Sequence, residues 1–410
     1  MNDTNQRIVF FDASSTTPVD PRVLEKMLPY FSEEYGNPSS HIHKKGVAAG
    51  EALEKAREQV AKLINAETDE ITFNSGATEG NNIAILGYLR ANPDQRKHII
   101  ISEIEHFSVL NIGYRLQREG YELTVLPTDK YGMVSPDDLK KAIKPGTGLI
   151  SIQHANPEIG TIQQVKELAA IAREKEIYFH CDSACGAGTI PTDVKDLGID
   201  CLTLSAHNYY GPKGVGALYI RKGVKISPLF DGGFQEMGIR PGTENLPGIV
   251  GMGAASELAK SEIPERNEYL APLGRGLWNG LQDKLKFIHF TGHPDERLPG
   301  HVSFWIEFVE GESLQLMLSM KGIMVSSGSA CSSNLKGEDE EDLAASHVLT
   351  AVGVPIEFCS GSLTFNMTKE ATKADLEYVL EELPVIVERL LSMSPLYADY
   401  MQKQKGQDKE

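Results

Sequence analysis

The sequence is poor in cysteine and has no long apolar run, and each shortage excludes a class of protein. Five cysteines, an odd number spread over 410 residues, do not form the disulfide framework of a small secreted protein, so we expect reduced thiols. Apolar stretches such as residues 148–153 are far shorter than the ~20 residues that span a bilayer. The first residues lack the basic segment and apolar run of a signal peptide. We predict a cytoplasmic protein with no membrane association.

Basic side chains are also scarce. The chain has 40 Lys and Arg against 57 Asp and Glu, which gives a formal net charge of −17. Because binding to nucleic acid requires concentrated positive charge, we expect no nucleic-acid partner. Hydrophobic residues at 41% and charged residues at 24% are near the averages of globular proteins, so the chain is expected to fold.

Short β-branched runs alternate with helical segments over most of the chain. The runs that we expect to be strands are residues 70–74, 98–102, 122–126, 149–153, 177–181, 201–205 and 216–220. Strands separated by helices predict an α/β fold with a mainly parallel sheet.

The rhythm changes after about residue 260. A helix over 270–285, a strand over 301–308 and helices over 312–320 and 372–391 predict a smaller α+β domain. We therefore expect a large domain over 20–260, a small domain formed by 1–19 and 261–400, and a flexible polar tail over 401–410.

Residues 75–80, of sequence SGATEG, form a turn of small residues between an expected strand and an expected helix. The N-terminus of a helix offers free backbone N–H groups to an anion, and the hydroxyls of Ser75 and Thr78 add donors. The turn is thus a candidate phosphate site, although an ordinary helix cap explains the same residues. It matches neither the Walker pattern nor GxGxxG, so a nucleotide is not indicated.

Three other segments carry polar groups of interest. Asp182 follows an expected strand, where α/β proteins place ligand contacts, and could keep a pyridine nitrogen protonated; a turn-forming aspartate is the alternative. Residues 205–214 leave the next strand with polar side chains that could close around a phosphate. Cys331 lies among serines and glycine over 326–333. An exposed thiol in such a stretch suits covalent sulfur transfer.

Together these segments resemble the NifS/IscS cysteine desulfurases, which have the class V aminotransferase fold. The resemblance runs from about residue 11 to 396 in the family's order and includes DASSTTPVDPRV, SGATEGNN, GPKGVGALYIR, RPGTEN, EGESL and SSGSACSS. It implies a fold type I transferase that depends on pyridoxal phosphate (PLP), with a large domain built on a mostly parallel sheet and a smaller α+β domain. It also implies a homodimer with active sites near the subunit interface.

The resemblance further implies roles for single residues. The PLP phosphate would be held by Ala77, Thr78, Ser205 and His207, together with Thr243 of the other subunit. His106 would stack on the pyridine ring as a catalytic residue, and Asp182 would contact the ring nitrogen. The thiol of Cys331 would attack the adduct of cysteine with PLP and become a persulfide.

Four positions depart from the family pattern. The lysine that binds PLP covalently is replaced by Asn208, whose carboxamide can neither form an imine nor act as a base near neutral pH. The arginine that binds the substrate carboxylate is replaced by Thr364, and losing one partner of such a pair costs about 2–5 kcal/mol. Pro157 and Cys185 replace an asparagine and a glutamine near the PLP hydroxyl. The changes gather on the reacting side of the ring, whereas the phosphate side is retained.

These departures indicate a degenerate homologue that does not take sulfur from cysteine by lysine-dependent chemistry. We expect it to act through Cys331 as a persulfide carrier, an iron–sulfur cluster ligand or a scaffold, with a sulfur acceptor or an iron–sulfur scaffold protein as its partner. Two alternatives stay open. One is an active PLP-dependent desulfurase that converts L-cysteine to L-alanine and a Cys331 persulfide, and the other is a lysine-free enzyme that uses PLP non-covalently.

Three further features have ordinary explanations. Lys213 belongs to the family's GPKG turn and is not expected to replace the missing lysine. Cys181 and Cys185 flank Asp182, but adjacent strand residues face opposite ways, so we predict no metal site. The acidic run over 335–345 is interpreted as a solvated loop, with docking of a partner as the alternative.

Overall fold

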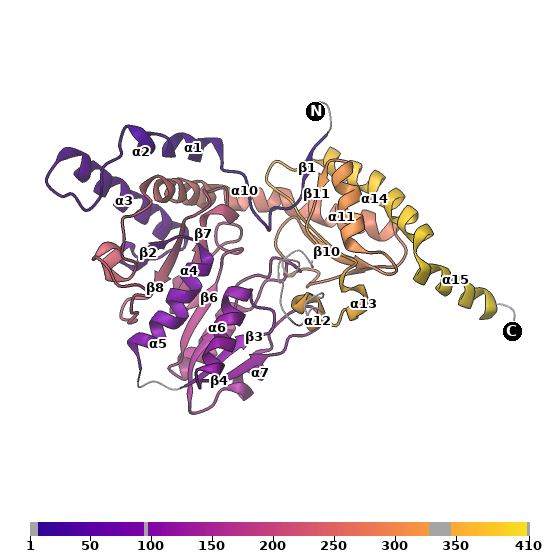
Figure 1. The fold of residues 1–410 in the computed structure, drawn as a ribbon, viewed down its shortest axis with the longest axis horizontal. Helices are drawn as coiled ribbons and strands as arrows, with labels where there is room; N and C mark the ends of the chain where they lie inside the picture. The colour runs from indigo at the N-terminus through magenta and orange to yellow at the C-terminus, as the bar shows by residue number, and fades with distance from the viewer. Residues whose placement is uncertain (1–6, 94–96, 328–345, 408–410) are drawn as a thin grey trace.

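The computed structural model describes residues 7–93, 97–327 and 346–407, and its larger lobe is built on a seven-stranded sheet (Figure 1). In spatial order the strands are β2 (Ile71–Asn74), β8 (Gly216–Ile220), β7 (Cys201–Ser205), β6 (Tyr178–Asp182), β5 (Thr147–Ser151), β3 (His98–Ser102) and β4 (Glu122–Leu126). The five strands from β7 to β4 are parallel, and β8 is antiparallel to both of its neighbours. The predicted α/β fold with a mainly parallel sheet is confirmed.

Both faces of this sheet are covered by helices, which explains why all of its strands except β4 are buried along their whole length. Alternate residues of each strand point to opposite faces. One face packs against α3 (Lys44–Leu63), α8 (Val165–Glu174) and α10 (Leu246–Lys284). The other packs against α6 (Phe107–Arg118) and the helical segment of α4 (Ala77–Asn82), the π-helix η2 (Ile83–Gly87) and α5 (Tyr88–Ala91).

The smaller lobe has its own core around an antiparallel sheet of β9 (Ile288–Phe290), β10 (His301–Ile306) and β12 (Ser362–Asn366). It also contains α11 (Gly311–Met320), α14 (Lys373–Met393) and the parallel pair of β1 (Val9–Phe10) with β11 (Ile323–Met324). The N-terminal segment thus packs with the C-terminal third of the chain.

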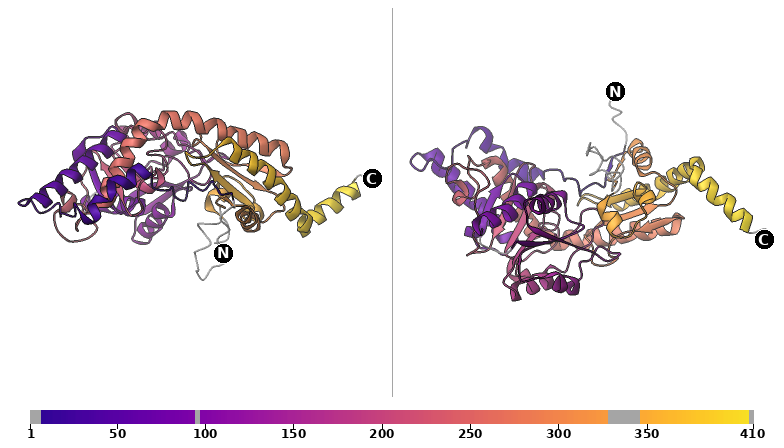
Figure 2. Two further views of the ribbon diagram at one scale, coloured as in Figure 1. Left: turned by 90° about the horizontal axis from the view of Figure 1, so that it is seen from above. Right: turned by 60° about the horizontal axis from the view of Figure 1, so that its bottom comes forward.

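Helix α10 connects the two lobes along one side of the molecule (Figure 2). It is 39 residues long and continuous through Pro264 and Pro272, so the predicted boundary after residue 260 lies inside it. Residues 401–407, which we expected to be flexible, continue α15 (Pro395–Gln407), a helix that projects from the body (Figures 1 and 2).

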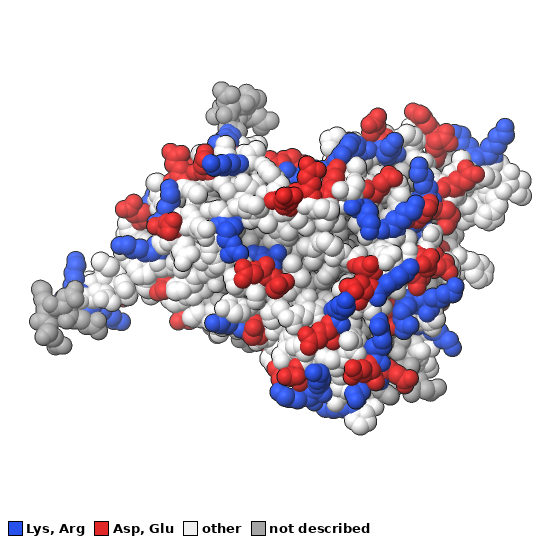
Figure 3. All heavy atoms as spheres, turned by 180° about the vertical axis from the view of Figure 1, so that it is seen from behind, with Lys and Arg blue, Asp and Glu red and all other residues white. Residues whose placement is uncertain are grey.

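The remaining helices are short and connect these elements. They are α1 (Pro21–Met27), α2 (Pro29–Ser32), η1 (Thr68–Glu70), α7 (Pro136–Ala142), α9 (Val194–Leu197), η3 (Ala206–Asn208), η4 (Gln235–Gly238), α12 (His347–Ala351) and α13 (Ile356–Cys359). Within the described ranges, no helix is both long and apolar enough to cross a bilayer. On the face shown in Figure 3, Lys and Arg side chains are interspersed with Asp and Glu.

Candidate active site

The predicted cofactor residues gather at the carboxyl edge of the parallel sheet. Asp182 is the last residue of β6, Ser205 is the last residue of β7, and the N-terminus of α4 follows β2. The carboxyl edge is where open α/β sheets bind ligands, because the loops that leave neighbouring strands meet there. The structure therefore brings together side chains that lie up to 130 residues apart in the sequence.

Asp182 is held by a hydrogen-bond network that extends to His106. Its Oδ2 accepts from Nδ2 of Asn81 at 2.7 Å, and its Oδ1 accepts from the N–H of Ala184 at 3.0 Å. Asn81 Nδ2 also donates to Ser108 Oγ at 2.8 Å, and Ser108 Oγ lies 2.7 Å from His106 Nδ1. The network fixes the carboxylate and the exposed imidazole relative to each other.

Asn81 and Ser108 were not among the residues that we predicted to matter. Asn81 lies one helical turn after Ala77 in the SGATEGNN segment, and Ser108 lies two residues after His106. Their positions beside predicted site residues were the only signal in the sequence. Asn81 is fully buried, and its amide joins two elements that are distant along the chain.

On the phosphate side, the hydroxyl of Ser205 is buried and has no hydrogen-bond partner among the residues that the structure describes. His207 is half-buried, with Nδ1 at 3.3 Å from Thr16 Oγ1, and burial together with Lys213 lowers the pKa of the imidazole. Thr78 is exposed on the first turn of α4, where Ala77 and Thr78 present backbone N–H groups that have no acceptor within the helix.

A salt bridge joins α4 to the loop that carries Thr243. Arg240 Nε lies 3.0 Å from Glu79 Oε1. Burial opposes ionisation of Glu79, but hydrogen bonds from Ser75 and Arg240 hold its pKa below the usual range. Thr243 itself is exposed on this loop, and its predicted role toward another subunit stays a prediction.

These residues fit PLP on two observations. The unpartnered Ser205 hydroxyl needs an acceptor or donor, which a phosphate oxygen provides. The carboxylate of Asp182 is buried and forms no ion pair within the described part of the chain, so it can hold a protonated ring nitrogen. Ala77, Thr78, Ser205, His207, His106 and Asp182 would hold the group.

On the reacting side lies Asn208, at the position where the resemblance expects an amine. Its Nδ2 lies 3.5 Å from the carbonyl oxygen of Ser14 and 3.9 Å from the sulfur of Cys185. Burial, aided by the charge of Asp182, raises the pKa of Cys185 to about 12, so this thiol stays protonated at neutral pH. No lysine is found among the described residues that line the cavity beside Asn208, and Lys213 is exposed.

Thr364 is committed to structural hydrogen bonds. It is buried in β12, and its hydroxyl donates to the carbonyl oxygen of Glu158 at 2.9 Å. The preceding residue, Pro157, accepts from His301 Nε2 at 2.9 Å. The carboxyl of Glu158 has a buried oxygen without a partner in the described part of the chain, and burial raises the pKa of this group to about 7. The region where the resemblance expects an arginine for the substrate carboxylate therefore contains the carboxyl group of Glu158. Thr364 adds no positive charge to it.

Two predicted features lie elsewhere. Cys331 and the acidic run over 335–345 fall outside the described residues. Cys181 packs in the core on the α8 side of the sheet, whereas Asp182 contacts Asn81 on the opposite side. Among the described residues, no group of His, Cys, Asp and Glu is arranged to hold a metal ion.

Comparison with known proteins supports the same family. The family model for class-V aminotransferases matches residues 9–374. A protein named cysteine desulfurase IscS from Methanosarcina thermophila is 51% identical over 96% of this chain and 95% of its own length. Another of that name from Dictyoglomus turgidum is 47% identical over 98% of this chain and 100% of its own.

Solved structures agree with the sequence comparison. A structure described as a NifS-like protein superposes with a TM-score of 0.86 at 36% identity, covering 93% of this chain and all of that one. The chain therefore belongs to the class-V aminotransferase family and, within it, to the NifS/IscS cysteine desulfurases.

Proposed function

We propose that this chain is a sulfur-transfer protein of the cysteine desulfurase family that takes sulfur from a persulfide donor and does not generate it from cysteine by lysine-dependent chemistry. The observation that carries the proposal is Asn208, the residue at the position where the resemblance expects the PLP lysine. Its amide lies beside Ser14 and Cys185, and no described lysine lines the same cavity.

Cys331 would perform the transfer. Its thiolate attacks the terminal sulfur of a donor persulfide, the S–S bond of the donor breaks, and the donor leaves as a thiolate. The product is a Cys331 persulfide, and no external oxidant or reductant is consumed. A cluster ligand or a scaffold for an iron–sulfur protein would use the same thiol. The homodimer, the sulfur acceptor and the cytoplasmic location are parts of this proposal.

A second candidate function follows from the retained phosphate side, because the unpartnered Ser205 hydroxyl and the Asp182 carboxylate fit PLP. PLP bound there without a covalent link would supply an electron sink. Asp182 would keep the ring nitrogen protonated, and His106, held by Ser108, would cover the ring. Asn208 would donate hydrogen bonds and would not move a proton.

The two sources of sulfur can be separated by mass spectrometry of the full-length protein. The protein is incubated with PLP and either isotope-labelled L-cysteine or a labelled low-molecular-weight persulfide, and its thiols are then alkylated. We expect labelled persulfide on Cys331 only with the persulfide donor, and none in Cys331→Ser. Loading of Cys331 from cysteine at a comparable rate would contradict the proposal.

A further inference from the structure

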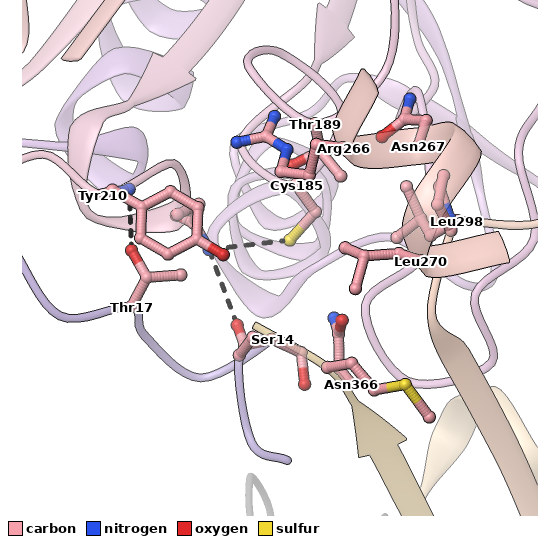
Figure 4. A pocket seen from close by; sticks show the side chains of 14 residues that line it. Ser14, Thr17, Cys185, Thr189, Tyr210, Arg266, Asn267, Leu270, Leu298 and Asn366 are labelled. Carbon is pink, nitrogen blue, oxygen red and sulfur yellow. Dashed lines mark hydrogen bonds between the residues drawn. The ribbon is translucent and has the colours of Figure 1, made fainter. Parts of the chain in front are cut away.

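A cavity of about 40 Å³ lies beside Asn208 (Figure 4). A volume of this size holds a few water molecules or one small ion and is too small for PLP or an amino acid. None of the predicted phosphate contacts lines it. Its polar lining includes Asn208 and Cys185 from the large lobe, Arg266 and Asn267 from α10, and Asn366 from the small lobe.

Arg266 brings an uncompensated charge to this cavity. It is 9% exposed, donates from Nη2 to the carbonyl oxygen of Gly188, and has Cζ 5.6 Å from the ring centroid of Tyr210. It forms no ion pair with any described carboxylate, and Glu262 and Glu370 act on it only from a longer range. Burial lowers the pKa of Arg266, but a guanidinium keeps its proton at neutral pH.

The acidic residue one helical turn before Arg266 is already engaged. Glu262, one turn before Arg266, pairs with Arg22 at 2.7 Å and lies 3.9 Å from Lys369. A buried cation without a counter-ion is strongly unfavourable, so an arrangement of this kind calls for an anion from outside the chain.

We propose that this cavity binds a small monovalent anion, of the size of chloride or hydrosulfide, against the guanidinium of Arg266. The amide of Asn208 is available as a donor, because its contacts to Ser14 and Cys185 are long, at 3.5 and 3.9 Å. The side-chain oxygen of Asn267 is buried, has no partner among the described residues and points toward the cavity (Figure 4). Rotating that amide turns its N–H groups inward, and the S–H of hydrosulfide could also satisfy the oxygen.

The position of Arg266 on α10 supports a role in binding an anion, because this arginine is not on the exposed side of the helix. Ile263, Arg266, Leu270 and Leu277 are all buried, at spacings that place them on one side of the helix. A guanidinium in such an apolar stripe costs stability unless a partner is present. The anion supplies that partner, and its binding does not depend on the sulfur-transfer proposal.

Thermal unfolding of the full-length protein tests the site. We expect the Tm to rise by about 2–4 °C when chloride replaces gluconate at equal ionic strength. Arg266→Met should abolish this difference. The matched control is Arg275→Met, which changes an exposed arginine of the same helix that is paired with Asp295 and should respond like the unmodified protein.

Asn208→Asp keeps the test decisive if Arg266→Met does not fold. This isosteric change places a carboxylate in the cavity beside Arg266. We expect a higher Tm without chloride and no further rise with it, because the carboxylate takes the place of the anion. A crystal grown in bromide should show an anomalous peak against Arg266 in the unmodified protein and none in Asn208→Asp.

Anaerobic titration with sodium hydrosulfide in chloride-free buffer identifies the natural ligand. A half-maximal shift at a tenfold lower concentration than chloride assigns the site to sulfur, and the opposite order assigns it to a halide. Equal Tm values in chloride, hydrosulfide and gluconate would overturn the proposal. An unaltered chloride response in Arg266→Met, or bromide bound as an adventitious ion only, would overturn it as well.

Discussion

The phosphate side and the reacting side of the pocket differ in the polar groups that they offer to a ligand. On the phosphate side, the Ser205 hydroxyl is buried without a partner, and Asp182 is held in place but forms no ion pair with a described residue. On the reacting side, Thr364 is bonded to the backbone of Glu158, and Cys185 is a protonated thiol. Under the proposed function, the first side binds a ligand and the second side does not supply lysine-dependent chemistry.

From this contrast we infer that one half of the site binds a ligand and that the other half does not carry out the reaction of the family. Unsatisfied buried polar groups cost stability, so they persist where a ligand satisfies them. At the positions where the resemblance expects a lysine and an arginine, the reacting side carries Asn208, with a long contact to the carbonyl of Ser14, and Thr364, bonded to the carbonyl of Glu158. The proposed roles of carrying sulfur or holding a cofactor without a covalent link follow from this interpretation of the two sides.

Restoring both lost groups should produce the largest effect. In Asn208→Lys, Thr364→Arg, we expect sulfide release from L-cysteine with PLP to rise at least ~100-fold, because a positioned general base contributes about 10²–10⁴ in rate. Asn208→Gln, Thr364→Arg is the matched control, because it adds length without an amine. If the unmodified protein releases sulfide from L-cysteine as fast as the double variant, the reacting side does not lack the groups for this reaction, and the comparison of the two sides is wrong.

The next effect in size concerns Asp182. Asp182→Asn removes the negative charge beneath the predicted ring nitrogen while it keeps the shape of the side chain. Loss of one partner of a buried charged pair costs about 2–5 kcal/mol, so we expect PLP binding to weaken at least ~30-fold in an absorbance titration. Asp193→Asn, at the N-cap of α9, is the control and should bind PLP normally. Unaltered affinity in Asp182→Asn would show that the phosphate side is not a cofactor site.

Ser205→Ala should have a smaller effect in the same assay. The lost hydrogen bond to a charged phosphate is worth about 1.5–3 kcal/mol, which corresponds to a roughly 10- to 150-fold weaker affinity for PLP. In the absence of PLP the variant should be as stable as the unmodified protein, since the hydroxyl has no partner to lose. Ser261→Ala, on the exposed side of α10, is the matched control. Equal loss of affinity in both variants would argue against a phosphate contact at Ser205.

The smallest expected effect is a pH dependence of the free energy of unfolding that arises from Glu158 on the reacting side. Burial raises the pKa of Glu158 from its model-peptide range to about 7, so the folded state holds a proton that the unfolded state has released above pH ~4.5. Stability from this group is therefore full below pH ~4.5 and is lost as the pH rises toward 7, by about 1–3 kcal/mol. Glu158→Gln should flatten the pH profile of urea unfolding over this range.

Glu105 contributes a slope of the same sign, because burial raises its pKa to about 8. The difference between the unmodified protein and Glu158→Gln isolates the part that belongs to Glu158. If the two pH profiles run parallel, the carboxyl of Glu158 is not buried as the structure describes.

Much of the fold could be predicted because it depends on local patterns. The strands of the large sheet are short β-branched runs, and their burial on both faces follows from the helices between them. Helix α10 was predicted only over 270–285, whereas it begins at Leu246 and runs through both Pro264 and Pro272, residues that ordinarily break a helix. Packing along α3 and α14 offsets their local cost, and packing between distant segments has no local signature.

The site could be predicted only in part for the same reason. Asp182, Ser205 and His207 follow strands and lie in motifs, so sequence order was enough to find them. The bridge through Asn81 and Ser108 and the cavity at Arg266 are made by segments that meet only in three dimensions. The one signal for Arg266 was a charge in the apolar stripe of its helix.

The most direct test of the account is a search for a covalent link between PLP and the protein. The full-length chain is incubated with PLP, reduced with borohydride and digested, and every lysine peptide is examined by mass spectrometry. The account predicts that PLP binds without a reduced adduct on any pocket lysine and that Asn208→Lys acquires one at residue 208. A reduced adduct on a single lysine of the unmodified protein, at full occupancy, would contradict it.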